Sequence, residues 1–189
     1  MKLRYGALAL ALAFIADVST VAQEDPDIRK ELETQYQKLA EAHEREDLVT
    51  ILNMKTADFH SIFPDGRVGD CKQMEQYSKQ FLESNEPPYH IKVTIQKLTV
   101  SENKLIAVAE VLQEATRYRE LAGQRRKVDT SVLQRETWSK TADGWKLKLV
   151  DSVHDQKRFV DGKRVDPTKP YDPDAPPYDP EGAAAAKKP

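Results

Sequence analysis

Residues 89–96 read Tyr-His-Ile-Lys-Val-Thr-Ile-Gln, and this stretch decides the fold. Apolar and polar side chains alternate in it with a period of two, which is typical of a β-strand with one buried face. Turn residues at 101–103, Gly123 and Asp143-Gly144 divide the chain that follows into three more long segments. We therefore expect four long antiparallel strands, of which the last three cover 104–119, 126–140 and 145–156.

Helical patterns precede these strands. Apolar residues recur at helical spacing from Ile28 to His43, and we expect Asp27 to cap this first helix. Asp47 is expected to cap a short second helix. A hairpin at 59–68, with Pro-Asp-Gly at its turn, comes next.

A third helix begins with a capping-box pattern. Asp70 and Gln73 have the spacing of a capping box, and Pro87-Pro88 stops the helix because proline cannot continue it. This order of elements predicts an α+β fold, in which a cone-shaped, curved antiparallel sheet packs on three N-terminal helices. The open mouth of such a cone is a natural place for a small apolar ligand.

The two ends differ in composition from the middle. Residues 1–22 have a basic start, an apolar run and Thr20-Val21-Ala22, which indicate a secretory signal peptide cleaved before Gln23. We therefore expect a secreted or periplasmic protein. Residues 23–166 form the folded domain in this scheme. Residues 167–189 are rich in proline and predict a disordered tail, which is either a solvated extension or a segment that binds a partner.

Composition excludes several classes of function. The 189 residues carry a formal net charge of −2, so we expect no nucleic-acid partner. A single cysteine and four histidines without metal-ligand spacing argue against a metal site. Nucleotide-binding motifs are absent from the sequence, so we expect no cofactor, and after signal cleavage we expect no membrane span.

Three short motifs carry a resemblance to a known superfamily. They are Ala57-Asp58-Phe59 with Pro64–Arg67, then Arg135–Trp138, then Asp143–Leu147. Together with the order of elements, they resemble the nuclear transport factor 2-like superfamily and its secreted SnoaL-like members of unknown function. The resemblance implies a cystatin-like roll, a pocket between sheet and helices, and dimers formed through the sheet. It does not imply one activity, because function lies in the site and not in the fold.

Two carboxylates are candidate catalytic residues. Asp151 falls on the strand face shared by Trp145, Leu147 and Leu149, where a carboxylate has a raised pKa or a basic partner. Members similar to ketosteroid isomerase use inward acidic residues as a base. The alternative is a plain ion pair between Asp151 and Arg135. Asp58 is the second candidate for this role.

Other side chains are candidates for the pocket lining, although each has a structural interpretation as core or surface. Arg135 either binds an anionic group inside the cone or lies on the solvated face. The pocket candidates are Tyr36, His60, Tyr77, Phe81, Arg135 and Trp145.

Three functions follow from these patterns. The leading hypothesis is a secreted, non-catalytic or weakly catalytic module that binds a small apolar or carbonyl-containing ligand. In this hypothesis the protein forms a homodimer. The second is a cofactor-independent isomerase, dehydratase or cyclase that uses an inward carboxylate. The third is a protein–protein interaction module that uses the sheet face.

Cys71, at the start of the third helix, is either a reactive thiol or a bystander.

Overall fold

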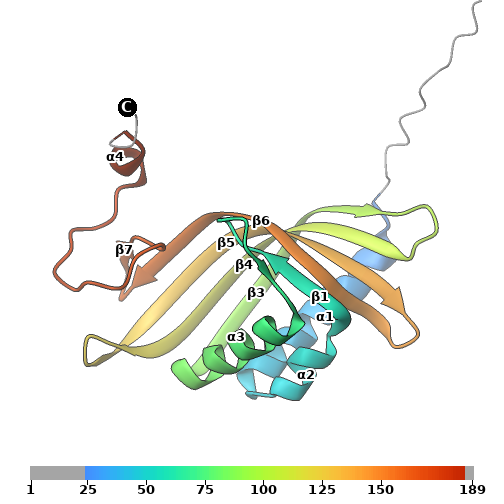
Figure 1. Cartoon of the computed structure of the whole chain (residues 1–189), viewed down its shortest axis with the longest axis horizontal. Coiled ribbons are helices and arrows are strands. Elements are labelled where there is room, and N and C mark those ends of the chain that lie inside the picture. The colour runs from blue at the N-terminus through green and yellow to red at the C-terminus, as the bar shows by residue number, and fades with distance from the viewer. Residues whose placement is uncertain (1–23, 186–189) are drawn as a thin grey trace, which may run out of the picture.

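The computed structural model describes residues 24–185, so the predicted signal peptide lies outside the described residues. Four helices and seven strands follow one another in this part of the chain (Figure 1). In chain order they are α1 (Pro26–Glu44), α2 (Leu48–Asn53), β1 (Lys55–Ile62), β2 (Val68–Gly69), α3 (Cys71–Ser84), β3 (Glu86–Val100), β4 (Ile106–Leu121), β5 (Gln124–Thr141), β6 (Gly144–Val160), β7 (Lys163–Val165) and α4 (Pro180–Ala185).

Helix α1 begins two residues earlier than predicted. Its N-cap is Asp25, whose side chain accepts hydrogen bonds from the backbone N–H groups of Asp27 at 3.1 Å and Ile28 at 3.2 Å. The predicted cap, Asp27, lies in the first turn instead. The reason is Pro26, which has no N–H to satisfy and is favoured at the first helical position.

The caps of the next two helices confirm the sequence patterns. The side chain of Asp47 accepts a hydrogen bond from the backbone N–H of Thr50 at 3.0 Å. In α3 the Asp70 carboxylate accepts from the backbone N–H of Gln73 at 2.9 Å, and the Gln73 side chain accepts from the backbone N–H of Asp70 at 3.0 Å. This reciprocal pair is the predicted capping box.

The sheet is mixed and not purely antiparallel. Its strand order is β2-β1-β6-β5-β4-β3, with β7 paired to β6. All the long hairpins are antiparallel as predicted, but β1 pairs with β6 in parallel. The parallel pair arises because β1 lies beside β6, the last long strand. The sequence pattern of a local hairpin at 59–68 carries no information about this distant pairing. The prediction of a curved sheet packed on three N-terminal helices is confirmed.

The helices cover only part of one face of the sheet. Figure 1 shows α1, α2 and α3 gathered beneath one portion of the long strands, while the β4–β5 hairpin and the end of β6 extend past them. The register of β4 with β5 is continuous from Ile106–Ser139 to Leu121–Gln124. Because paired residues share a face, this register assigns every side chain of both strands to the helix-facing or the outer side.

Strand β6 breaks its alternation at a β-bulge. Trp138 pairs with Leu147, but Thr137 pairs with Leu149, so Lys148 is an extra residue in β6. Immediately after Lys148, each side chain of β6 points to the face opposite to the one it would have in a strand without the bulge. Val150 therefore packs against the core, and Asp151 points outward beside Arg135. The prediction that Asp151 shares the inward face of Trp145 and Leu147 is wrong for this reason.

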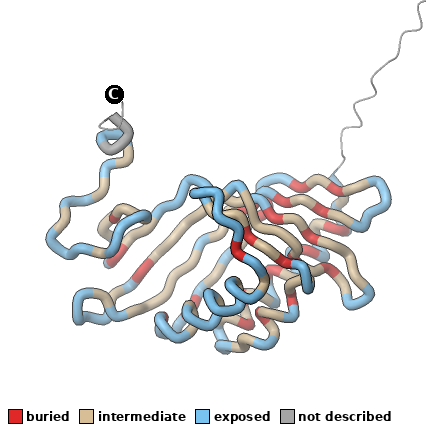
Figure 2. Tube along the Cα trace, viewed as in Figure 1, coloured by how far each residue is buried: buried red, intermediate tan, exposed pale blue. Residues whose placement is uncertain are grey.

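The main core lies between α1 and the sheet. Ile28, Leu32 and Tyr36 of α1 are buried against Trp138 and Trp145 of the sheet. Figure 2 shows that buried positions gather in this region, whereas α3 carries none. The core therefore fills one end of the space under the curved sheet and reaches α3 only through the partly buried Met74.

The proline-rich segment also differs from its predicted disordered state. Tyr171 packs against a second small cluster of Val128, Val160 and Val165. Further along, the backbone N–H of Tyr178 donates to the carbonyl of Arg164 at 2.9 Å. The Tyr171 side chain supplies apolar surface that the overall composition concealed, and the backbone hydrogen bond of Tyr178 ties the segment to β7.

No helix within residues 24–185 has both the length and the hydropathy needed to cross a membrane.

Candidate functional site

A buried carboxylate lies at the centre of the helix-facing side of the sheet. Glu136 of β5 is only 4% exposed. The Tyr36 hydroxyl of α1 donates a hydrogen bond to its Oε2 at 2.7 Å, and Trp138 Nε1 donates to the same oxygen at 3.1 Å. Gln134 Nε2 donates to Oε1 at 2.7 Å. The network connects α1 to the sheet through a buried polar centre.

This network has the features of a structural anchor. Burial raises the pKa of the Glu136 carboxyl, although its three donors favour the charged form. Burial and the nearby Glu136 carboxyl raise the pKa of Tyr36 well above its ordinary value. Both oxygens of Glu136 are bonded to donors of the protein itself. A general base needs a carboxylate oxygen that is free to accept a proton from a substrate, and the hydrogen bonds from Tyr36, Trp138 and Gln134 engage both oxygens of Glu136.

The predicted catalytic residue Asp151 forms an ion pair on the outer face. Arg135 donates from Nε and Nη2 to the two carboxylate oxygens of Asp151, each at 2.7 Å. This bidentate contact lowers the pKa of Asp151. The structure therefore matches the ion-pair alternative for these two residues.

The other catalytic candidate, Asp58, also lies on the outer face. Strand β1 buries Phe59 and Ser61, so Asp58 and His60 alternate to the opposite side. Asp58 pairs with Lys148 Nζ at 3.1 Å, and hydrogen bonds from Thr56 and Lys148 lower its pKa. His60 places its Nδ1 3.2 Å from the Asp58 carbonyl. Neither side chain reaches the space between helices and sheet.

A hollow of about 370 Å³ opens on this outer face. Its lining residues come from β3, β4, β5 and β6, and apolar atoms make up most of its surface. The lining residues are Gln96, Glu110, Leu133, Gln134, Arg135, Ser152 and His154. Of the predicted pocket residues, only Arg135 takes part, and its guanidinium is engaged by Asp151.

The predicted aromatic residues separate into core and surface. Tyr36 and Trp145 are buried in the main core, where Trp145 Nε1 donates to Glu31 at 2.5 Å. Tyr77 of α3 is 45% exposed and packs edge-on against Phe63, with ring centroids 5.8 Å apart. These three residues therefore do not line a common site.

Phe81 is the predicted pocket residue that does face the sheet from α3. Its ring lies 5.7 Å from the His43 ring and 6.0 Å from the Tyr89 ring. The Arg117 guanidinium carbon lies 5.4 Å from the Phe81 ring centroid. We call these four residues the Phe81 cluster. It brings α1, α3, β3 and β4 together beyond the end of the main core.

The Phe81 cluster contains two partly buried basic groups. Burial lowers the pKa of His43, whose Nδ1 lies 2.8 Å from the Leu39 carbonyl. Burial, with the charges of Arg119 and Arg158, lowers the pKa of Arg117 to about 10. Sequence reasoning missed Arg117 and Glu136. The signal was present in both strands, because each residue lies an even number of positions from side chains that face the helices.

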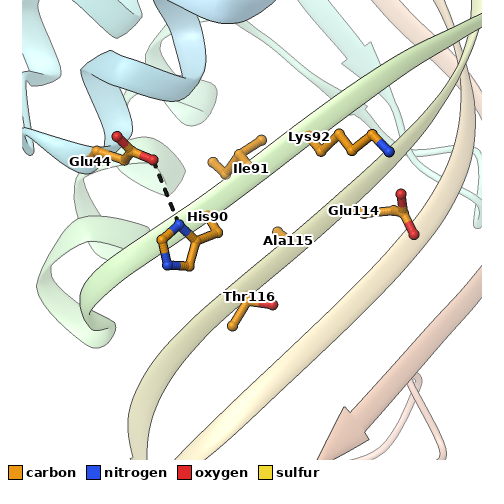
Figure 3. A pocket seen from close by; sticks show the side chains of 7 residues that line it. All are labelled: Glu44, His90, Ile91, Lys92, Glu114, Ala115 and Thr116. Atoms are coloured by element: carbon orange, nitrogen blue, oxygen red, sulfur yellow. Dashed lines mark ion pairs between the residues drawn. The ribbon is translucent and has the colours of Figure 1, made fainter.

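A shallower hollow of about 230 Å³ lies at the edge of the sheet. Figure 3 shows His90 turned toward Glu44 of α1, while Lys92 and Glu114 project together from the neighbouring part of the strands. The His90 Nδ1 atom is 3.8 Å from a Glu44 oxygen. Basic and acidic groups are balanced here, so the hollow offers little to an apolar ligand.

Among the side chains that the structure describes, no three histidine, cysteine or acidic residues gather as they would around a metal ion. Cys71 is half-buried at the first position of α3.

Comparison with solved structures identifies the fold. A candidate dehydratase of the nuclear transport factor 2-like family from Streptomyces avermitilis aligns with a TM-score of 0.52 and 16% identity, over 67% of this chain and 96% of that one. A Nostoc punctiforme protein of unknown function with a cystatin-like fold aligns with a TM-score of 0.53 and 14% identity, over 77% and 96%.

A conserved protein from Planctomyces limnophilus aligns with a TM-score of 0.55 and 13% identity, over 68% of this chain and 97% of that one. No family model and no curated protein matches the sequence. The chain therefore has the nuclear transport factor 2-like, cystatin-like fold that the sequence motifs predicted.

We predict that Asp151→Asn lowers the free energy of unfolding by less than about 1 kcal/mol, because an ion pair with a half-exposed arginine contributes little. Urea denaturation measures this change, and Arg135→Gln, which breaks the same pair, is the matched control. A loss well above that value would mean that the outer-face pair is a structural centre.

We predict that Glu136 makes stability depend on pH in the direction opposite to most carboxylates. Its folded-state pKa is raised, so its contribution is fully present below the unfolded value of about 4.3 and is lost as the pH rises through the folded pKa. The stability difference between the wild-type protein and Glu136→Gln should therefore fall from pH 4 toward pH 7.

Urea denaturation at several pH values measures this difference, with Glu110→Gln on the outer face of β4 as the control. A difference for Glu136→Gln that stays constant or grows with pH would contradict the prediction.

Proposed function

We propose that this protein, which has the nuclear transport factor 2-like fold, binds a small ligand at the Phe81 cluster, between α3 and the helix-facing side of the sheet. One observation carries the proposal: α3 has 14 residues and none of them is buried. An amphipathic helix ordinarily buries its apolar face in the core. Here the apolar face of α3 remains partly accessible beside the uncovered strands.

The change of side chains along the sheet supports this position. On the helix-facing side of β4, the fully buried Ala107, Ala109 and Val111 are followed by the half-buried Gln113 and Ala115. The core residues thus end where the small and polar ones begin. Ligand sites combine an apolar lining with a few polar groups, and the Phe81 cluster has both.

The arrangement of carboxylates supports binding without catalysis. The alternative activity, that of a cofactor-independent isomerase, dehydratase or cyclase, needs an inward carboxylate that is free to move a proton. Asp151 and Asp58 are paired with Arg135 and Lys148 on the outer face. Glu136 faces inward, but both of its oxygens accept hydrogen bonds from the protein.

The third hypothesis, a protein–protein interaction module on the sheet face, has weaker support. The charged side chains of the outer face near β6 form ion pairs with one another, so they do not require a partner. The homodimer through this face stays a prediction.

Export to the periplasm or the cell exterior is part of the proposal and rests on residues 1–22 alone. We predict that the protein recovered from its native cells begins at Gln23, which N-terminal sequencing would measure. A mature chain that begins at Met1 would contradict export by signal cleavage.

We predict that Ala115→Trp abolishes binding of a small neutral apolar probe, naphthyl methanol, because the indole would cover the sheet surface next to Arg117 of the Phe81 cluster. Ala115 faces the helices, and its neighbour Glu114 faces outward. Glu114→Trp is therefore a matched control that adds the same side chain to the opposite face and should leave binding unchanged.

Isothermal titration calorimetry measures the binding, and circular dichroism checks that both variants fold. Thr130→Phe, on the neighbouring strand of the same face, serves as a second filling variant. Equal binding by all four proteins would place the ligand elsewhere.

A further inference from the structure

Several arginines lie together on the helix-facing side of the sheet, where it extends past the helices. Arg117 and Arg119 are two residues apart on β4, so they share a face. On β5, Thr130 is opposite Ala115, and Arg158 of β6 is opposite Thr130. All three arginines therefore project from one face, and we call Arg117, Arg119 and Arg158 the arginine cluster.

The arginine cluster lacks acidic partners among the described residues. No carboxylate oxygen in this part of the chain lies within 4.0 Å of any of its three guanidinium groups, whereas the adjacent Arg126 pairs with Asp161 at 2.9 Å. Arg117 donates to the neutral hydroxyl of Thr130 at 2.9 Å. Arg158 donates to two backbone carbonyls, those of Asp166 and Lys169, each at 2.6 Å.

The nearest acidic side chains are engaged elsewhere. Asp129 accepts from Thr116 at 2.5 Å and pairs with Lys127 at 3.1 Å, on the outer face of the hairpin. The Asp166 carboxylate accepts from Thr168 at 2.6 Å and pairs with Lys169 at 3.4 Å. Burial lowers the pKa of Arg117 and of Arg158, and the Asp129 and Asp166 carboxylates partly offset this lowering, but neither carboxylate forms an ion pair with the cluster.

The cluster also leaves buried donors unsatisfied. The Nε atoms of Arg117, Arg119 and Arg158 are buried and have no hydrogen-bond partner. The three groups also repel one another, because Arg119 and Arg158 both lower the pKa of Arg117, and Arg119 lowers that of Arg158. Buried unpaired donors and adjacent like charges are both unfavourable, so such a group is typical of a site that receives an anion.

An apolar surface adjoins the positive charge. The Phe81 ring lies 5.4 Å from the guanidinium carbon of Arg117, with α3 above it partly accessible. A ligand could therefore place an anionic end on the arginines and an apolar body against Phe81. Guanidinium groups bind carboxylate and phosphate oxygens in a bidentate manner, which gives the site directional specificity.

We propose that the arginine cluster is an anion site that binds the carboxylate or phosphate end of a small organic ligand, while Phe81 contacts the apolar part of that ligand. The proposal rests on the ligand-binding function proposed above and names the chemical class of the ligand.

The experiment compares three probes that share one ring system: naphthoate, naphthyl phosphate and the neutral naphthyl methanol. Their dissociation constants for the purified protein are measured by isothermal titration calorimetry. We expect at least one anion to bind about 10-fold or more tighter than the neutral probe, because hydrogen bonds to charged groups contribute about 1.5–3 kcal/mol. The stronger of the two anions identifies a carboxylate or a phosphate as the recognised group.

Variants then test the arginines. Arg119→Gln should weaken anion binding about 10-fold and leave binding of the neutral probe unchanged. Arg117→Gln should weaken binding of the anions more than that of the neutral probe, because Arg117 also contacts Phe81. Arg45→Gln, at the exposed C-terminal end of α1, is the matched control and should not alter either. Arg117→Lys keeps the charge and loses the bidentate fork, so it should bind with intermediate affinity.

Salt provides a readout that needs no variant. Raising the ionic strength should weaken binding of the anions and not that of naphthyl methanol. If the neutral probe binds as tightly as the anions and the arginine variants have no effect, the anion site is wrong and the ligand-binding function stands. If no probe binds, both proposals fail.

Discussion

The hydrogen bond from the Tyr36 hydroxyl to the Glu136 carboxylate, at 2.7 Å, holds α1 against the centre of the sheet. Trp138 completes the contact by donating to the same oxygen, with its ring packed edge-on against Tyr36. A buried carboxyl is tolerated only where donors surround it, so this pairing admits very few alternative positions for the helix. The position of α1 in turn determines which end of the curved sheet is filled by the main core and which end lies beyond it.

The register of β6 has a comparable influence on the chemistry of the protein. The extra residue at Lys148 moves Val150 to the inside and Asp151 to the outside. Further register shifts follow along β6, where Ser152 and Asp155 both adopt positive φ angles of 50°. They bend the strand, and they bring Arg158 onto the same face as Arg117. The same irregularities thus remove a carboxylate from the interior and add a basic group to it.

The two ends of the space under the sheet are suited to different tasks. At the α1 end, Trp138 and Trp145 fill the interior and stabilise the fold through buried apolar area. At the α3 end, the cover is an amphipathic helix without a buried residue, and the strands carry small or basic side chains. Most of the buried apolar residues lie in the first region, and the second is where we propose that the ligand binds.

The agreement between sequence and structure is closest where the signal is local. The capping box of Asp70 and Gln73 and the cap at Asp47 are contacts between residues three apart, so the sequence contains both partners. The cap of α1 lies two residues before the predicted Asp27, because Pro26 is favoured at the first helical position. For the proline-rich segment, average composition concealed the packing of Tyr171 and the backbone hydrogen bond of Tyr178 to Arg164.

The sequence by itself determined the order of helices and strands, the turns between them and the resemblance to a cystatin-like roll, because periodicity and capping act over a few neighbouring residues. Only the tertiary structure decided the parallel pairing of β1 with β6, the outward position of Asp151, the enclosure of Glu136 and the gathering of Arg117, Arg119 and Arg158. Each of these depends on the register between distant strands, and a shift of one residue exchanges the two faces of a sheet.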